Sequence, residues 1–155
     1  MDFTEWDTRL AAYAVIIDDR NKVLLTWYNG DRPHPQWTLP GGGVEYDDES
    51  LEAAVAREVK EETGYDVEVG PPLATSTLTT PDGPRPPRPY KSVRMVFTAV
   101  VTGGELGTIE VGGTTDRAEW FPLDLLTDAS PRADIVDLAL SALRYRQTLH
   151  QTVGR

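Results

Sequence analysis

The sequence has 155 residues, 39% of them hydrophobic and 26% charged, which is typical of one globular domain with a single hydrophobic core. Its formal net charge of -10, with no cluster of Lys and Arg, opposes binding to a nucleic acid polymer. Because the chain has no cysteine, a disulfide framework and a thiolate metal site are both excluded, and a bound metal would need oxygen ligands or one of the two histidines.

The sequence shows no membrane or secretion signal. No stretch of about 18 apolar residues occurs, and the first residues lack both the basic start and the apolar core of a signal peptide. We therefore expect a cytoplasmic protein without a membrane partner. We also expect one domain over residues 1–155, with its core at about 9–147.

The first elements in chain order are a predicted hairpin and a loop. Mostly apolar runs cover residues 9–17 and 22–28, and the turn-like residues 18–21 lie between them, which indicates two strands. Residues 29–36 include a glycine and two prolines, which favour a loop. Residues 37–39 form a short extended segment, which we expect to end at the three glycines that follow Pro40.

The best-defined predicted element is a helix over about residues 50–63. Asp48 or Ser50 can cap its start, and acidic residues crowd its first turn. Gly64 follows its end, where a left-handed residue is favoured.

The second half of the chain predicts three more strands and a final helix. Residues 66–79 and 91–101 are β-prone, and residues 81–89 between them hold five prolines, which favour a surface loop. Residues 118–121 predict a short strand, and Ser130-Pro131 predicts the N-cap and first position of the final helix. The apolar stripe of that helix comprises Ile135, Leu138, Ala139, Ala142 and Leu143. This order of elements favours an α/β (α+β) fold, with a mixed sheet between helices.

Carboxylates occupy an unusual position on the central helix. At about 100° per residue, Glu58 and Glu62 fall on the same stripe as Leu51 and Val55, which should pack against the sheet. The usual interpretation of an acidic helix is a solvated face, but the like-charge pair of Glu58 and Glu62 would then cost a few tenths of a kcal/mol. A cation would compensate the pair. Together with Glu61 and the nearby glycine carbonyls, these side chains offer the oxygen ligands that Mg²⁺ or Mn²⁺ prefers.

The same segment resembles the Nudix box, G-x5-E-x7-R-E-U-x-E-E-x-G-U, where U is apolar. The matching residues are Gly43, Glu49, Arg57, Glu58, Val59, Glu61, Glu62, Gly64 and Tyr65, with Tyr65 at a position where an aliphatic residue is more usual. Residues 37–42 and 119–124 also resemble family patterns, so the likeness covers roughly residues 9–143. The resemblance implies the α/β/α Nudix fold and a Mg²⁺-dependent hydrolase, with Mn²⁺ as an alternative. Its substrate would be a nucleoside diphosphate derivative, namely a nucleoside triphosphate, ADP-ribose or a nucleotide sugar.

The resemblance also implies roles for residues of the box. The implied metal ligands are the carboxylates of Glu58, Glu61 and Glu62 and the carbonyl of Gly43, and the metal would orient the attacking water. Arg57 would fix the rotamer of a helix carboxylate, and Glu49 would fix the loop or bind a metal through water. Gly64 would have a structural role. Glu61 or Glu58 would deprotonate the water, unless an acid on a distant loop does so; the candidates for that acid are Asp116, Glu110 and Glu119.

Residues outside the box give weaker predictions for substrate binding. The chain's best basic group for a terminal phosphate is Arg85, Arg88, Lys91 and Arg94, although solvated loop charges explain this group slightly better. Trp37 and other aromatic residues in the strands offer a stacking surface for a nucleobase, although such residues mostly belong to a core. His34 and His150 are expected to be solvated.

Two other functions that this fold can have are less well supported by the sequence. A Nudix-fold module can bind a nucleotide without hydrolysing it, but such modules usually lose acids of the box, and all of them are present here. An isomerase of prenyl diphosphates would need a cysteine nucleophile, which the chain lacks. Family members often form homodimers, so the expected partners are a small nucleotide substrate and, as an open alternative, a second copy of the chain.

Overall fold

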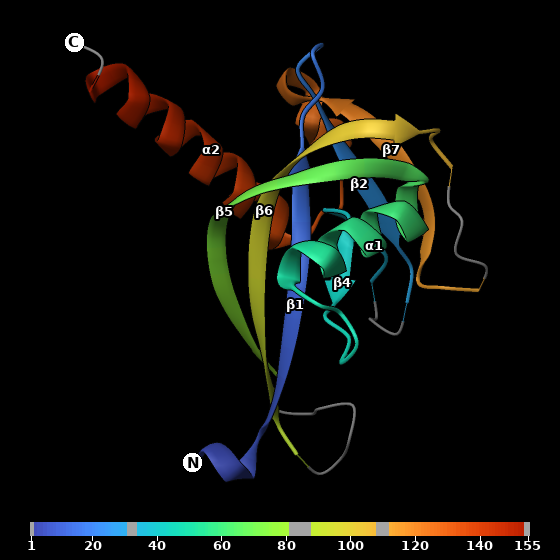
Figure 1. The fold of residues 1–155 in the computed structure, drawn as a ribbon, viewed down its shortest axis with the longest axis vertical. Helices are drawn as coiled ribbons and strands as arrows, with labels where there is room; N and C mark the ends of the chain where they lie inside the picture. Colours follow the sequence, from blue (N-terminus) through green and yellow to red (C-terminus); the bar gives the residue numbers. More distant parts are fainter. Residues whose placement is uncertain (1, 31–33, 81–87, 108–111, 154–155) are drawn as a thin grey trace.

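The structure of the protein is a computed structural model that describes residues 2–30, 34–80, 88–107 and 112–153. Its strands are β1 (Asp7–Ile16), β2 (Lys22–Tyr28), β3 (Gln36–Thr38), β4 (Gly41–Gly43), β5 (Tyr65–Thr80), β6 (Tyr90–Gly104) and β7 (Thr115–Pro122). Its helices are α1 (Leu51–Thr63) and α2 (Asp134–Val153), with short 3-10 helices η1 (Phe3–Glu5) and η2 (Leu123–Asp128). One sheet has the strand order β4-β1-β6-β5 and the other the order β3-β2-β7 (Figure 1).

Strand β1 lies in the middle of the fold and is covered on both faces. It pairs in parallel with β6 and antiparallel with β4. Ala12 and Ala14 pack in one apolar cluster with Val55 of α1, whereas Ala11 and Tyr13 belong to a second cluster that includes the start of α2. A strand buried on both faces has a continuous apolar sequence, which explains the run that predicted it. The predicted mixed sheet between helices is confirmed.

The extended segment β3 ends before the three glycines, as predicted, but the glycines also form a strand of their own, which the sequence did not predict. Strand β4 pairs with Ala11, Ala12 and Tyr13 of β1. Gly41 has a φ of 141°, and a Cβ atom there would lie 2.4 Å from the carbonyl oxygen of Ala12. Glycine is normally depleted in strands, but here other groups approach the backbone too closely for a side chain.

Helix α1 begins and ends where the sequence predicts. The Ser50 hydroxyl accepts a hydrogen bond from the Ala53 N–H at 3.0 Å, which satisfies a free donor of the first turn. Gly64 adopts the left-handed conformation, with a φ of 80°, and its N–H donates to the Lys60 carbonyl at 2.9 Å. Because Ser50 caps the helix, Asp48 is available for another contact.

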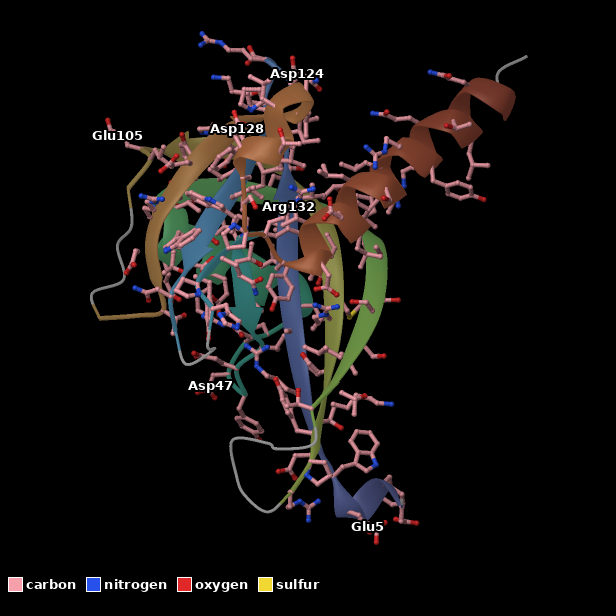
Figure 2. All side chains as sticks on the ribbon, turned by 180° about the vertical axis from the view of Figure 1, so that it is seen from behind. Glu5, Asp47, Glu105, Asp124, Asp128 and Arg132 are labelled. Atoms are coloured by element: carbon pink, nitrogen blue, oxygen red, sulfur yellow. The ribbon has the colours of Figure 1, made fainter. Side chains whose placement is uncertain are left out.

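Helix α2 begins at Asp134, so the prediction that Ser130-Pro131 caps it was wrong. The residues before the helix instead extend the edge of β3: the Trp37 N–H donates to the Pro131 carbonyl, and the Ala133 N–H donates to the Trp37 carbonyl, both at 2.8 Å. Figure 2 shows Arg132 at this junction between η2 and α2. The C-terminal part of α2 extends beyond the sheets (Figure 1). No helix within the described residues is long and apolar enough to cross a membrane.

Candidate active site

The C-terminal half of α1 lies against the glycine strand β4. A Cβ atom on Gly42 would lie 2.8 Å from the carboxylate of Glu58, so only a residue without a side chain allows this approach. The N–H of Gly41 donates to Oε2 of Glu62 at 2.9 Å. The glycines of β4 and the glutamates of α1 therefore form one site, as their proximity in the box predicts.

Glu62 is a buried carboxylate that connects α1 to both sheets. It is 6% exposed, and its second oxygen, Oε1, accepts a hydrogen bond of 2.6 Å from the Thr115 hydroxyl at the start of β7. Buried carboxylates need such donors because burial removes their hydration. The sequence contains no signal for the contact with Thr115, because the two residues are far apart in the chain.

This contact gives a prediction for stability. Thr115→Val keeps the shape of the side chain but removes the donor, and the resulting loss for a buried acceptor is expected to lower the free energy of unfolding by about 1–3 kcal/mol. Urea denaturation measures the change. Thr77→Val is the matched control, since Thr77 is exposed on β5 and its replacement should change stability by less than about 0.5 kcal/mol. Equal stabilities of the two variants would contradict a stabilising role for the Thr115 hydrogen bond.

Arg57 is the centre of an ion-pair network. Its Nε and Nη2 donate to the two carboxylate oxygens of Asp48 at 3.0 and 2.9 Å. Asp48 also accepts from the Glu45 N–H at 2.7 Å. The hydrogen bonds to Asp48 raise the pKa of Arg57, and the bond from Arg57 lowers the pKa of Asp48. The guanidinium is therefore charged and fixed in orientation over the site.

The other contacts of Arg57 bring together three of the four expected metal ligands. Nη1 donates to Oε1 of Glu58 at 3.1 Å and to Oε2 of Glu61 at 3.2 Å, while Nη2 donates to the Gly43 carbonyl at 3.2 Å. These oxygens therefore face a single cationic group. Glu62, the fourth expected ligand, faces Gly41 and Thr115 instead.

The donor set fits part of the oxygen shell of a hard divalent cation. Within the described residues, no three acidic, histidine or cysteine side chains are arranged to hold a metal by themselves. Mg²⁺ is usually bound through one or two carboxylates together with water and substrate phosphates, and not by a complete protein cage. Glu58, Glu61 and the Gly43 carbonyl provide this kind of partial oxygen shell.

Arg57 contacts the helix carboxylates of Glu58 and Glu61, as expected, and also forms a bidentate pair with Asp48, which was not expected. The sequence suggested Asp48 only as an alternative cap of the helix. Because Ser50 is the cap, the Asp48 carboxylate is free to pair with Arg57. Of the three distant acids, Asp116 lies next to Thr115 on β7 and accepts a hydrogen bond from the Asn29 side chain.

The structure gives less support to Glu119 and Glu110 as the acid that deprotonates the water. Glu119 is exposed and forms an ion pair with Arg117 at 3.3 Å. Glu110 lies outside the described residues. Of the two described distant acids, Asp116 directly follows Thr115, the residue that donates to Glu62.

The expected basic group does not assemble into one cluster. Arg88 binds Asp7 at 2.9 Å, Lys91 lies over the Trp6 ring, and Arg94 is buried in a bidentate pair with Asp134 at 2.8 and 2.9 Å. The hydrogen bonds to Asp134 raise the pKa of Arg94. Arg85 lies outside the described residues. Because each described cation already has a partner, the sequence prediction of a shared phosphate site here is not supported by the packing.

Trp37 is a core residue in the structure. It is 4% exposed and packs edge to face against Trp27 and Phe121, with centroid distances of 5.1 and 4.7 Å. The Arg117 guanidinium lies 5.0 Å from its ring centroid. So little exposed surface leaves no face of the ring for stacking with a nucleobase.

A family model and several known proteins that resemble this chain indicate the same family. A model of the NUDIX domain matches residues 7–139. An ADP-ribose pyrophosphatase of Methanocaldococcus jannaschii is 39% identical over 111 residues, which cover 72% of this chain and 60% of that protein. An 8-oxo-dGDP phosphatase of Danio rerio is 35% identical over 136 residues, which cover 86% of this chain and 38% of that protein. The chain spans about half the length of the curated relatives that it matches.

A solved structure extends the likeness to three dimensions. The crystal structure of a MutT NUDIX hydrolase from Burkholderia pseudomallei superposes with a TM-score of 0.70 at 27% identity. The match covers 88% of this chain and 98% of the other. The fold of this chain therefore resembles that of this NUDIX hydrolase over most of both chains.

Proposed function

Because the chain belongs to the NUDIX domain family, we propose that it hydrolyses the diphosphate linkage of a nucleoside diphosphate derivative. The observation that carries the proposal is the approach of the Glu58 carboxylate to Gly42, beside a carbonyl and a second carboxylate that face the same guanidinium. Such a partial oxygen shell is suited to a cation whose remaining ligands are water and the phosphates of a substrate.

Each residue of the site has a proposed task. Glu58, Glu61 and the Gly43 carbonyl would hold Mg²⁺, with Mn²⁺ as the alternative, whereas Glu62 would fix α1 against β4 and β7 through Gly41 and Thr115. When bound, the metal neutralises the charge of the diphosphate and lowers the pKa of a bound water. Arg57 is a positioning residue, because its fork to Asp48 fixes the guanidinium against Glu58 and Glu61.

Glu61 is the proposed acceptor of the proton from the attacking water. Arg57 holds its Oε2, and its side chain is 41% exposed, so solvent reaches the side chain. Asp116, which accepts from Asn29, is the alternative acceptor. A proton acceptor must lie within hydrogen-bonding distance of the water or be linked to it through another water.

The two relatives described above act on different nucleoside diphosphates, so both substrate types are candidates. One is named for ADP-ribose and the other for 8-oxo-dGDP. Nucleotide sugars and nucleoside triphosphates share the same diphosphate group and belong to the same panel.

The test is a screen of the purified protein with Mg²⁺ against these four substrate types, followed by chromatography of the products. Turnover of at least one substrate is expected, and EDTA should abolish it because unneutralised carboxylates would face the phosphates. Added Mg²⁺ in excess should restore it. Binding of a nucleotide without any turnover would instead favour a module that senses nucleotides.

A further inference from the structure

Arg9 is a half-buried cation for which the described residues provide no ion pair or hydrogen bond. Its neighbours differ in this respect: Arg88 is paired with Asp7, and Arg94 with Asp134. Asp7 lies on the same face of β1 as Arg9, but Arg88 already binds it at 2.9 Å. A half-buried guanidinium without an acidic partner is unusual in a chain with a net charge of -10.

The Arg9 guanidinium lies directly over the glycine strand. A Cβ atom on Gly43 would lie 3.3 Å from Nη2, 3.6 Å from Nε and 3.7 Å from Cζ of Arg9. The carbonyl of the same glycine accepts from Arg57 at 3.2 Å. Gly43 therefore lies beside two guanidinium groups, one that belongs to the carboxylate network and one that has no acidic partner among the described residues.

Strand β4 separates Arg9 from the carboxylates. Successive residues of a strand point to opposite faces, so Gly42 faces Glu58 of α1, whereas Gly43 faces Arg9 on the side of α2. β4 is the outer strand of its sheet. A ligand that contacts both faces of β4 would therefore have to pass around this edge.

Ser92 places a second polar group beside Arg9. It is the partner of Arg9 in the parallel pairing of β1 and β6, so both side chains lie on the same face. Ser92 is 3% exposed, and its hydroxyl has no hydrogen-bond partner within the described residues. Buried hydroxyls normally have a partner, which a bound ligand or an ordered water at this position would supply.

We propose that Arg9 binds a phosphate of the substrate on the α2 side of β4, while the carboxylates on the α1 side hold the part of the diphosphate that is cleaved. This inference rests on the proposed function and assigns the substrate a second anion-binding position. Arg9 is suited to this role because a guanidinium offers a fork of donors to phosphate oxygens.

The first measurement is the affinity for α,β-methylene-ADP, a diphosphate that cannot be cleaved between its phosphorus atoms, by calorimetry with Mg²⁺ present. Arg9→Gln is expected to raise the Kd by about 10- to 100-fold, which is the loss of one or two charge-assisted hydrogen bonds. Arg9→Lys keeps the charge but loses the fork, so its Kd should lie between those of the wild type and Arg9→Gln.

Arg20→Gln is the matched control. It removes the same charge from the exposed turn between β1 and β2. Its Kd should stay within about twofold of the wild type, because solvent and salt screen an exposed charge. Thermal midpoints of all variants show that they are folded. Equal Kd values for Arg9→Gln and Arg20→Gln would overturn the assignment of Arg9.

The same variants separate this inference from the proposed function. If the wild type hydrolyses a substrate of the panel and Arg9→Gln changes neither its KM nor the Kd of the analogue, Arg9 is not a binding residue but the hydrolase remains. If the wild type binds the analogue and hydrolyses nothing, the proposed function fails, and a weaker Kd in Arg9→Gln still establishes the anion site.

Discussion

Glu58→Gln is expected to lower kcat/KM by at least about 100-fold, the upper limit of what the loss of an outer-shell metal contact costs. Glutamine has the same size as glutamate, and its amide oxygen can still accept the hydrogen bond from Arg57 that Glu58 receives at 3.1 Å. The fold should therefore be retained. The negative charge is lost, and with it the attraction for a divalent cation in a site where Glu58 is a ligand.

The measurement combines steady-state kinetics with a titration of Mn²⁺ followed by calorimetry. The variant should bind Mn²⁺ more weakly as well as turn over more slowly, which separates the loss of a ligand from a merely structural effect. Glu52→Gln is the control, because Glu52 is exposed in the first turn of the same helix. If kcat/KM of the Glu58→Gln enzyme lay within about threefold of that of the Glu52→Gln enzyme, the mechanism would be refuted, because removal of a metal ligand has a larger effect on activity.

Gly42→Ala is expected to lower kcat by about 10- to 100-fold, because misplacement of a catalytic group by about 1 Å can have an effect of this size. The added Cβ would lie 2.8 Å from the carboxylate of Glu58, so that carboxylate must move. Gly42 has no positive φ, unlike Gly41. The backbone of β4 can therefore accept alanine, and the effect should fall on the side chain of Glu58.

The control for this variant is Gly103→Ala. A Cβ atom on Gly103 would meet its nearest neighbour, the carboxylate of Asp66, at 3.5 Å, which is an ordinary contact. Both variants should unfold cooperatively, with Gly103→Ala keeping wild-type kcat. A Gly42→Ala enzyme with the same kcat as Gly103→Ala would show that the position of Glu58 does not matter for the reaction.

The two variants of the site act on it from opposite sides. Glu58→Gln removes a charge and leaves the geometry, whereas Gly42→Ala keeps the charge and changes the geometry. If Glu58 is a metal ligand, both should raise the Mg²⁺ concentration needed for half-maximal activity. A loss of activity without this shift would place Glu58 outside the metal shell.

Several elements could be predicted because their signals are local. The cap at Ser50, the left-handed Gly64 and the acidic stripe of α1 depend on residues within a few turns of one helix. The apolar run of β1 depends on burial of both faces, which the composition of the strand alone records.

Other features were predicted wrongly or not predicted because a distant segment decides them. Ser130-Pro131 has the composition of a helix start, but the backbone of Trp37 pairs with this segment and delays α2 until Asp134. The glycines of β4 have low strand propensity, but pairing with β1 and contact with Glu58 make them a strand.

The sequence by itself limited the chemistry open to this protein, since the absence of cysteine leaves oxygen and histidine ligands, and the identity and helical spacing of the glutamates favour a hard cation. The tertiary structure decided which partner each charged side chain has. It pairs Arg57 with Asp48 and buries Arg94 against Asp134. It also places the Thr115 hydroxyl as a donor to Glu62, and the Arg9 guanidinium over Gly43. The physical reason is that spacing along a helix fixes which side chains share its face, whereas partners across strands depend on sheet register and on which cations other segments have already neutralised.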